Sequence, residues 1–140
     1  MVRQEKGQSV VEFALIIPLF LLLILGMIYG GFAYADYLQY STAVREAARD
    51  IAMQKPENRQ ALVDGLESDT ENIVKKYASP LTTLYKPDFS ASITAGNADE
   101  PGMVQVSVKL KRNVDVRILP EEFQPLQCTM PLEKDLESSS

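Results

Sequence analysis

The residues of this chain that are best placed to do chemistry lie near its N-terminus. Glu12 is the only charged side chain between Lys6 and Asp36, and it stands at the start of a long apolar run. If the peptide bond after Gly7 is hydrolysed, Gln8 gains a free ammonium group four residues before Glu12, on the same face of a helix. After such a cleavage the new ammonium group could neutralise Glu12 within the chain or on an adjacent subunit, because an unpaired carboxylate in apolar surroundings is costly.

A structural role explains Glu12 equally well. The segment Ser9-Val10-Val11-Glu12 fits a capping box, with Ser9 as the N-cap and Glu12 at the third helical position. A carboxylate is also favourable near a helix N-terminus because of the helix dipole. The residues alone leave the cap and the processing role open.

The apolar run after Glu12 is long enough to cross a membrane. Residues 13–35 contain 23 residues and no charge, and a helix rising about 1.5 Å per residue then spans a hydrocarbon core of roughly 30 Å. Arg3 and Lys6 precede the run, so the positive-inside tendency places the N-terminus in the cytoplasm and the C-terminal part outside.

Three interpretations of residues 1–36 compete. Ala33-Tyr34-Ala35 fits a secretory signal peptide, but the apolar run exceeds the usual length of about 7–15 residues. An uncleaved single-pass anchor is the second interpretation. The third keeps the same topology, with residues 1–7 as a leader that is cut after Gly7. This cleavage removes the charges of Arg3, Glu5 and Lys6, so the free-energy cost of drawing the helix out of the bilayer falls.

Other features of the apolar run concern packing. Pro18 predicts a kink that a membrane helix tolerates. Gly26 and Gly30 form a Gly-x-x-x-Gly pair, which lets two helices approach closely, although glycine is common in membrane spans. The aromatic residues toward its outer end are expected to form a belt at the membrane surface: Tyr29, Phe32, Tyr34, Tyr37 and Tyr40.

Helical periodicity continues beyond the membrane and is then replaced by strand periodicity. No helix breaker precedes Pro56, so one helix is expected over residues 8–54, with its transmembrane part at 13–35. A second helix is expected from an N-cap at Asn58 to Ser79-Pro80. Alternating apolar residues then predict strands at 90–95, 103–111 and 126–132, with a turn at 96–102. Whether residues 103–119 form one bent strand or two stays open.

These elements predict an α+β fold, with a long helix, a second helix and a small antiparallel sheet. We expect residues 56–132 to form an exported α+β head domain and residues 133–140 a flexible tail. The single Cys128 is expected to be small, partly buried and unreactive, and the basic residues Lys109, Lys111 and Arg112 to protect a sheet edge.

Composition argues against several classes of function. The net charge is −5 and no Lys/Arg cluster occurs, which argues against nucleic-acid binding. With no His and one Cys, the chain lacks the ligands of a Cys/His metal site, the usual general base and an intramolecular disulfide. The acidic pairs Asp99-Glu100 and Glu121-Glu122 are expected to be solvated. We therefore expect no enzyme activity, no cofactor, no metal and no small-molecule substrate.

The N-terminal segment also resembles a known family. Gly7-Gln8-Ser9-Val10-Val11-Glu12-Phe13-Ala14-Leu15, followed by Pro18 and a Leu/Ile run, is similar to the start of TadE-like proteins. These are minor pilins or pseudopilins of the tight-adherence (Flp, type IVc) pilus system. Val44-Arg45-Glu46-Ala47-Ala48-Arg49 is similar to the segment after the family's membrane helix. The resemblance is specific over about the first fifty residues and is only architectural beyond them.

The resemblance implies a structural role. A prepilin peptidase would cut between Gly7 and Gln8, and Glu12 would act in processing, assembly or charge neutralisation. The implied partners are this peptidase, other pilin subunits along the N-terminal helix, and an inner-membrane assembly platform. The precursor would sit in the inner membrane, and the mature form in a pilus used for surface attachment. The alternative is an uncleaved single-pass assembly or secretion-system factor with an exported interaction domain.

Overall fold

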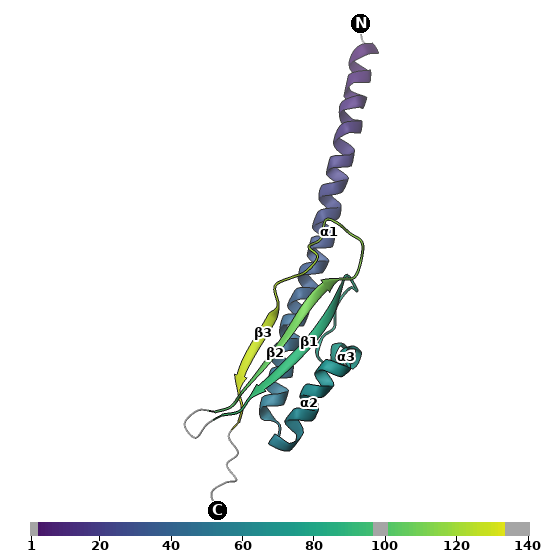
Figure 1. Cartoon of the computed structure of the whole chain (residues 1–140). Coiled ribbons are helices and arrows are strands. Elements are labelled where there is room, and N and C mark those ends of the chain that lie inside the picture. Colours follow the sequence, from purple (N-terminus) through teal and green to yellow (C-terminus); the bar gives the residue numbers. More distant parts are fainter. Residues whose placement is uncertain (1–2, 97–100, 134–140) are drawn as a thin grey trace, which may run out of the picture.

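The structure of the chain, a computed structural model, describes residues 3–96 and 101–133, with side chains from Gly7 onward. Its elements follow in the order α1 (Arg3–Met53), α2 (Pro56–Ser68), α3 (Thr70–Tyr77), β1 (Tyr85–Thr94), β2 (Met103–Arg112) and β3 (Leu126–Pro131). The three strands form one antiparallel sheet in the order β1-β2-β3. This confirms the predicted α+β fold class (Figure 1).

The first helix, α1, is a single element of 51 residues that continues through Pro18. It begins at Arg3, so the predicted leader is helical from there and continuous with the apolar run. Met1 and Val2 lie outside the described residues. In Figure 1 its N-terminal half stands free, whereas its C-terminal half lies along the head. The chain then turns into α2, whose first residue is Pro56, a position where proline loses no helical hydrogen bond.

The prediction of a single second helix was wrong. Two helices occupy this region, and the N-cap of the first is Lys55 and not Asn58. Asp69 separates them, because its backbone N–H closes α2 on the Gly65 carbonyl while its side chain accepts from the Asn72 N–H to cap α3. An aspartate that binds nearby backbone groups in this way favours a helix start over a helix interior.

The strand alternation of β2 is as predicted. Its inward residues Val104, Val106, Val108 and Leu110 are buried. Residues 113–119 form neither a second strand nor a continuation of β2, so both alternatives for residues 103–119 were wrong. Arg112 explains the loop, because its Nη1 donates to the carbonyls of Val116 (3.2 Å) and Leu119 (2.8 Å) and folds the chain back on itself.

All three helices pack on one face of the sheet. The shared core is formed by residues from α1, α2 and the strands, among them Tyr40, Val44, Ile51, Leu66 and Phe89. The other face is polar, with a contact between the hydroxyls of Ser90 and Ser107 (2.8 Å) and a bond from Gln105 to Gln127 (3.0 Å).

Three surface predictions can be compared with this sheet. Lys109 and Lys111 lie on β2, which is the central strand, so the prediction that they protect a sheet edge was wrong. Strand order depends on long-range pairing and could not be read from the local charge pattern. Glu121 and Glu122 are exposed, whereas Asp99, Glu100 and residues 134–140 of the predicted tail lie outside the described residues.

Candidate functional site

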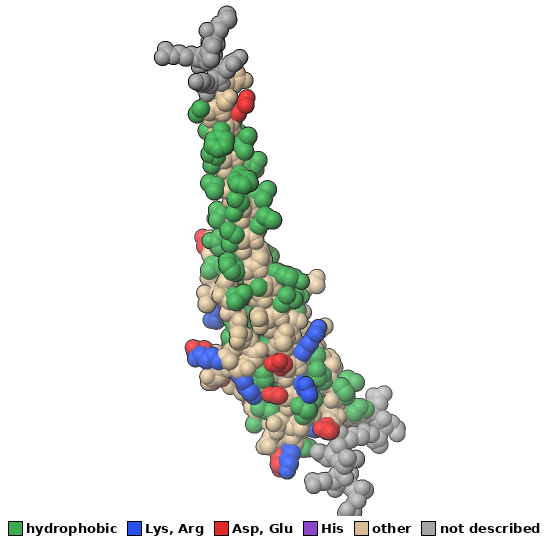
Figure 2. All heavy atoms as spheres, turned by 180° about the vertical axis from the view of Figure 1, so that it is seen from behind, with side chains coloured by type: hydrophobic (Ala, Val, Ile, Leu, Met, Phe, Trp, Pro, Cys, Tyr) green, Lys and Arg blue, Asp and Glu red, His purple; other side chains and the backbone are tan. Residues whose placement is uncertain are grey.

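The N-terminal half of α1 is an apolar surface that nothing in the described structure covers. One helix in the described residues is long and apolar enough to cross a membrane, and its most apolar window has a mean hydropathy of 2.7 with no buried residue. Figure 2 shows hydrophobic side chains along this part of the helix on the face in view, whereas charged side chains gather on the head. Leaving so much apolar surface in water is unfavourable, so this surface belongs in lipid or against protein.

At the start of this surface, Gln8 and Glu12 lie one helical turn apart. Gln8 Nε2 donates to Glu12 Oε1 at 3.5 Å, and both side chains are exposed. The predicted capping box is wrong for the full chain, because α1 begins at Arg3 and Ser9 therefore lies inside the helix. Glu12 is the only Asp or Glu between Lys6 and Asp36 in the sequence, and it lies close to the bond between Gly7 and Gln8.

The two glycines of the Gly-x-x-x-Gly pair face open space. A Cβ atom added at Gly26 or Gly30 would meet nothing within 4 Å. Nothing in the described part of the chain therefore requires glycine at these positions. The small surface that they create is available to another helix.

The apolar surface ends at a buried carboxylate that sequence reasoning missed. Asp36 is only 1% exposed. It accepts hydrogen bonds from the backbone N–H groups of Leu81 (2.7 Å) and Thr82 (3.3 Å) and a very short one from the Thr82 hydroxyl. These bonds fasten the loop before β1 to α1. The only sequence signal was a lone charge that ends a long uncharged run, which was interpreted as the end of the span.

The predicted aromatic belt is only partly at the surface. Phe32 and Tyr34 are exposed, but Tyr40 is buried beside the Phe89 ring (6.4 Å between centroids), and Tyr37 packs on Phe123 (5.3 Å). Tyr37 and Tyr40 therefore belong to the head, because the head covers the helix earlier than the hydropathy pattern suggested. Burial and, to a smaller extent, the charge of Asp36 raise the pKa of Tyr40 to about 12.

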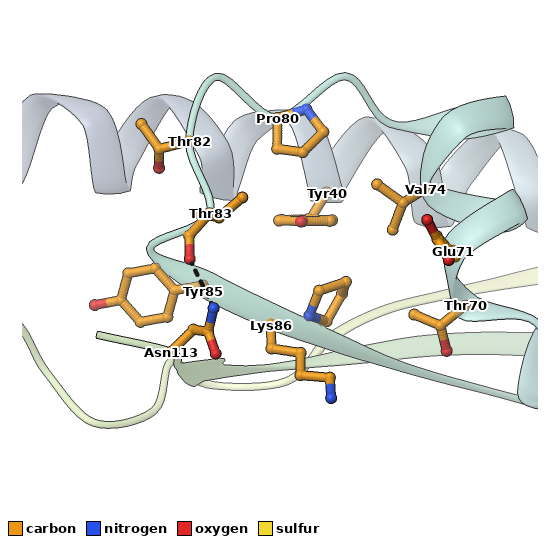
Figure 3. A pocket seen from close by; sticks show the side chains of 11 residues that line it. Tyr40, Thr70, Glu71, Val74, Pro80, Thr82, Thr83, Tyr85, Lys86 and Asn113 are labelled. Carbon is orange, nitrogen blue, oxygen red and sulfur yellow. Dashed lines mark hydrogen bonds between the residues drawn. The ribbon is translucent and has the colours of Figure 1, made fainter. Parts of the chain in front are cut away.

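A cavity of about 460 Å³ lies between α1, α3 and the start of β1. Figure 3 shows Tyr40, Val74 and Pro80 around it, with Glu71 and Lys86 also in its lining. Glu71 pairs with Lys75 at 3.4 Å instead of converging with another acid. Among the described residues, no group of three or more His, Cys, Asp or Glu side chains could hold a metal ion. Cys128 is a free, half-buried thiol on β3.

The exposed helix is long and apolar enough to anchor a single-pass membrane protein, and it carries a small α+β head. Residues 7–49 match the family model described as TadE-like protein. This match shows that the N-terminal segment is similar to TadE-like proteins. The match ends within α1, so the sheet and the two shorter helices lie outside it. A search of curated proteins and a search of solved structures each found no match.

Proposed function

We propose that this protein is a minor pilin or pseudopilin of a tight-adherence pilus. It is made as an inner-membrane precursor with a cytoplasmic N-terminus and is cut after Gly7 by a prepilin peptidase. It then joins or primes the pilus used for surface attachment. The observation that carries the proposal is the uncovered apolar half of α1, which has Gly7, Gln8 and Glu12 at its start.

The physical argument concerns what this helix can bind. In the precursor its apolar side chains face lipid, and in a filament the same side chains pack against the helices of other pilin subunits. The Glu12 carboxylate then needs a positive partner in an apolar environment, and the new ammonium group of Gln8, within the chain or on a neighbour, supplies one. Gly26 and Gly30 provide a place for close helix packing. An inner-membrane assembly platform would deliver the subunit.

The test is the intact mass and N-terminal sequence of the protein from native membranes that contain an active prepilin peptidase. The expected mature chain begins at Gln8. A chain that still begins at Met1 would support an uncleaved membrane factor and overturn the proposal, and a chain that begins at Asp36 would indicate a secreted head.

Three variants separate processing from assembly. Gly7→Val should abolish cleavage, whereas Gly65→Ala in the head should leave cleavage intact. Glu12→Gln should reduce the amount of protein in the pilus fraction because the charge pair with Gln8 is lost. If Glu12→Gln enters pili as efficiently as the parent chain, the assembly role of Glu12 is wrong.

A further inference from the structure

We propose that the end of the head nearest the apolar helix rests on the outer surface of the bilayer in the anchored protein. Leu81, in the loop before β1, and Ile118, in the loop after β2, are the apolar residues that contact lipid there. They are 66% and 59% exposed. The inference depends on membrane anchoring and not on cleavage after Gly7, so it can fail or succeed independently of the proposed function.

The first step concerns how deep the helix sits. A carboxylate inside the hydrocarbon is costly, so Glu12 sets the cytoplasmic boundary. At about 1.5 Å per residue, a hydrocarbon core of roughly 30 Å then ends near Phe32. Ala33, the next residue, is already buried beneath the head, and Tyr29 is half-buried against the core. The head therefore begins where the hydrocarbon ends, with no free length of helix between them.

The second step concerns the loop that carries Leu81. Its backbone N–H donates to Asp36 at 2.7 Å. Asp36 is four residues beyond Phe32, or about 6 Å along the helix. The headgroup layer extends roughly 5–8 Å beyond the hydrocarbon on each side. The Asp36 bonds therefore hold the Leu81 loop at the depth of the headgroups.

The third step concerns the loop that carries Ile118. In Figure 1 the chain after β2 rises past the end of the sheet toward the free part of α1. Arg112 holds this loop through the Val116 and Leu119 carbonyls, and Leu119 is buried, so Ile118 is left facing outward. Asp115 and Arg117 are exposed in the same loop, which limits it to the headgroup layer and keeps it out of the hydrocarbon.

Lipid is the favoured occupant of this surface because the surface continues directly from the membrane span. An apolar side chain at the membrane interface gains from partial burial without requiring a shaped partner. A docked protein would have to approach at the same depth as the headgroups, where the bilayer already fills the space.

The chain contains no Trp, so Leu81→Trp and Ile118→Trp each introduce a single fluorophore. The full chain is reconstituted in phosphatidylcholine–phosphatidylglycerol vesicles without brominated lipid, with lipid brominated near the headgroup end of the acyl chain, or with lipid brominated near the methyl end of the chain. Leu19→Trp in the span is the quenched control. Thr129→Trp is the unquenched control. Thr129 lies on the exposed face of β3. The chain just after β3 is bonded to the C-terminal end of α1, because the Glu133 N–H donates to the Ala52 carbonyl, so this strand runs away from the membrane span.

Leu81→Trp and Ile118→Trp should lose more intensity than Thr129→Trp with bromine near the headgroup, and less than Leu19→Trp with bromine near the chain end. Each should be quenched more by bromine near the headgroup than by bromine near the chain end. Quenching no greater than that of Thr129→Trp would overturn the inference. Blue-shifted emission without lipid quenching would also overturn it, since it would show that protein and not lipid covers the site. Circular dichroism shows whether each variant keeps the parent fold. The quenching of a variant is interpreted only if it does, and each of the two variants tests the inference by itself.

Discussion

At the scale of single residues, Asp36 joins the membrane helix to the head. Its carboxylate is buried and accepts bonds from two backbone N–H groups and one hydroxyl of the loop at residues 81–82. Hydrogen bonds to a charged acceptor contribute more than neutral ones, and donors left without a partner in a buried site cost free energy as well. Asp36 therefore contributes more to the free energy of unfolding than its position at the end of an apolar run suggests.

Replacement of Asp36 by alanine should lower the free energy of unfolding by about 2–4 kcal/mol, because the donors of Leu81 and Thr82 lose their acceptor. Urea unfolding of the detergent-solubilised chain measures the change. Asp115→Ala is the matched control, since Asp115 is exposed and its loss should alter stability by less than about 0.5 kcal/mol. Equal effects of the two substitutions would contradict the role given to Asp36.

The raised pKa of Tyr40 predicts how the stability of the fold changes at alkaline pH. Its pKa is raised to about 12 in the folded chain by burial and by the charge of Asp36, against about 10 in the unfolded chain. The folded state then holds the phenolic proton more tightly, so its stabilisation is fully present below about pH 10 and is lost as the pH rises toward 12. Tyr77 and Tyr85, whose pKa values are also raised mainly by burial, act in the same direction.

Tyr40→Phe should therefore flatten, without abolishing, the fall in stability between about pH 10 and 12. Urea unfolding at a series of pH values measures the slope. Phe89→Leu is the control, because it disturbs the same aromatic contact without removing a titrating group. Its curve should be lower than that of the parent but parallel to it. A parallel curve for Tyr40→Phe would show that its phenol does not cause the slope.

At the scale of elements, local patterns predicted what depends on neighbouring residues and failed where distant contacts decide. The burial of Val104, Val106 and Val108 followed from strict alternation, and the end of α1 at Met53 agrees with the absence of a breaker before Pro56. The helix break at Asp69 was missed although its bonds to Gly65 and Asn72 are local, because the apolar residues on either side of it keep helical spacing. The Asp36 contact was missed because its partners are 45 and 46 residues away.

The turn between β1 and β2 depends on a glycine for space. A Cβ atom at Gly102 would lie 2.9 Å from the Thr94 carbonyl oxygen and 3.0 Å from the Gly96 nitrogen. Gly102→Ala should therefore cost about 1–3 kcal/mol, because backbone atoms must shift. Gly65→Ala is the matched substitution in α2, where nothing lies within 4 Å, and it should stabilise by up to about 1 kcal/mol. Opposite signs in urea unfolding are expected, and equal signs would contradict this account.

At the scale of the whole molecule, the free half of α1 is separable from the folded head. Within the described residues, every core residue and every residue packed against the core lies at Tyr29 or beyond. The chain from residue 29 to 140 should therefore unfold cooperatively on heating, as measured by circular dichroism. A chain from residue 41 to 140 should not, because it lacks Ala33, Asp36 and Tyr40. Loss of cooperative unfolding in the longer fragment would show that the free half of α1 supports the head.

The burial of Ala33 and Asp36 has a consequence for proteolysis between Ala35 and Asp36. The Ala33-Tyr34-Ala35 sequence that would suit the general signal peptidase lies in a continuous helix, with Ala33 4% and Asp36 1% exposed. A protease must draw its substrate into an extended strand, and here that requires unwinding α1 and releasing the loop bonded to Asp36. In the folded protein, cleavage between Ala35 and Asp36 therefore requires local unfolding of α1 and of the loop bonded to Asp36.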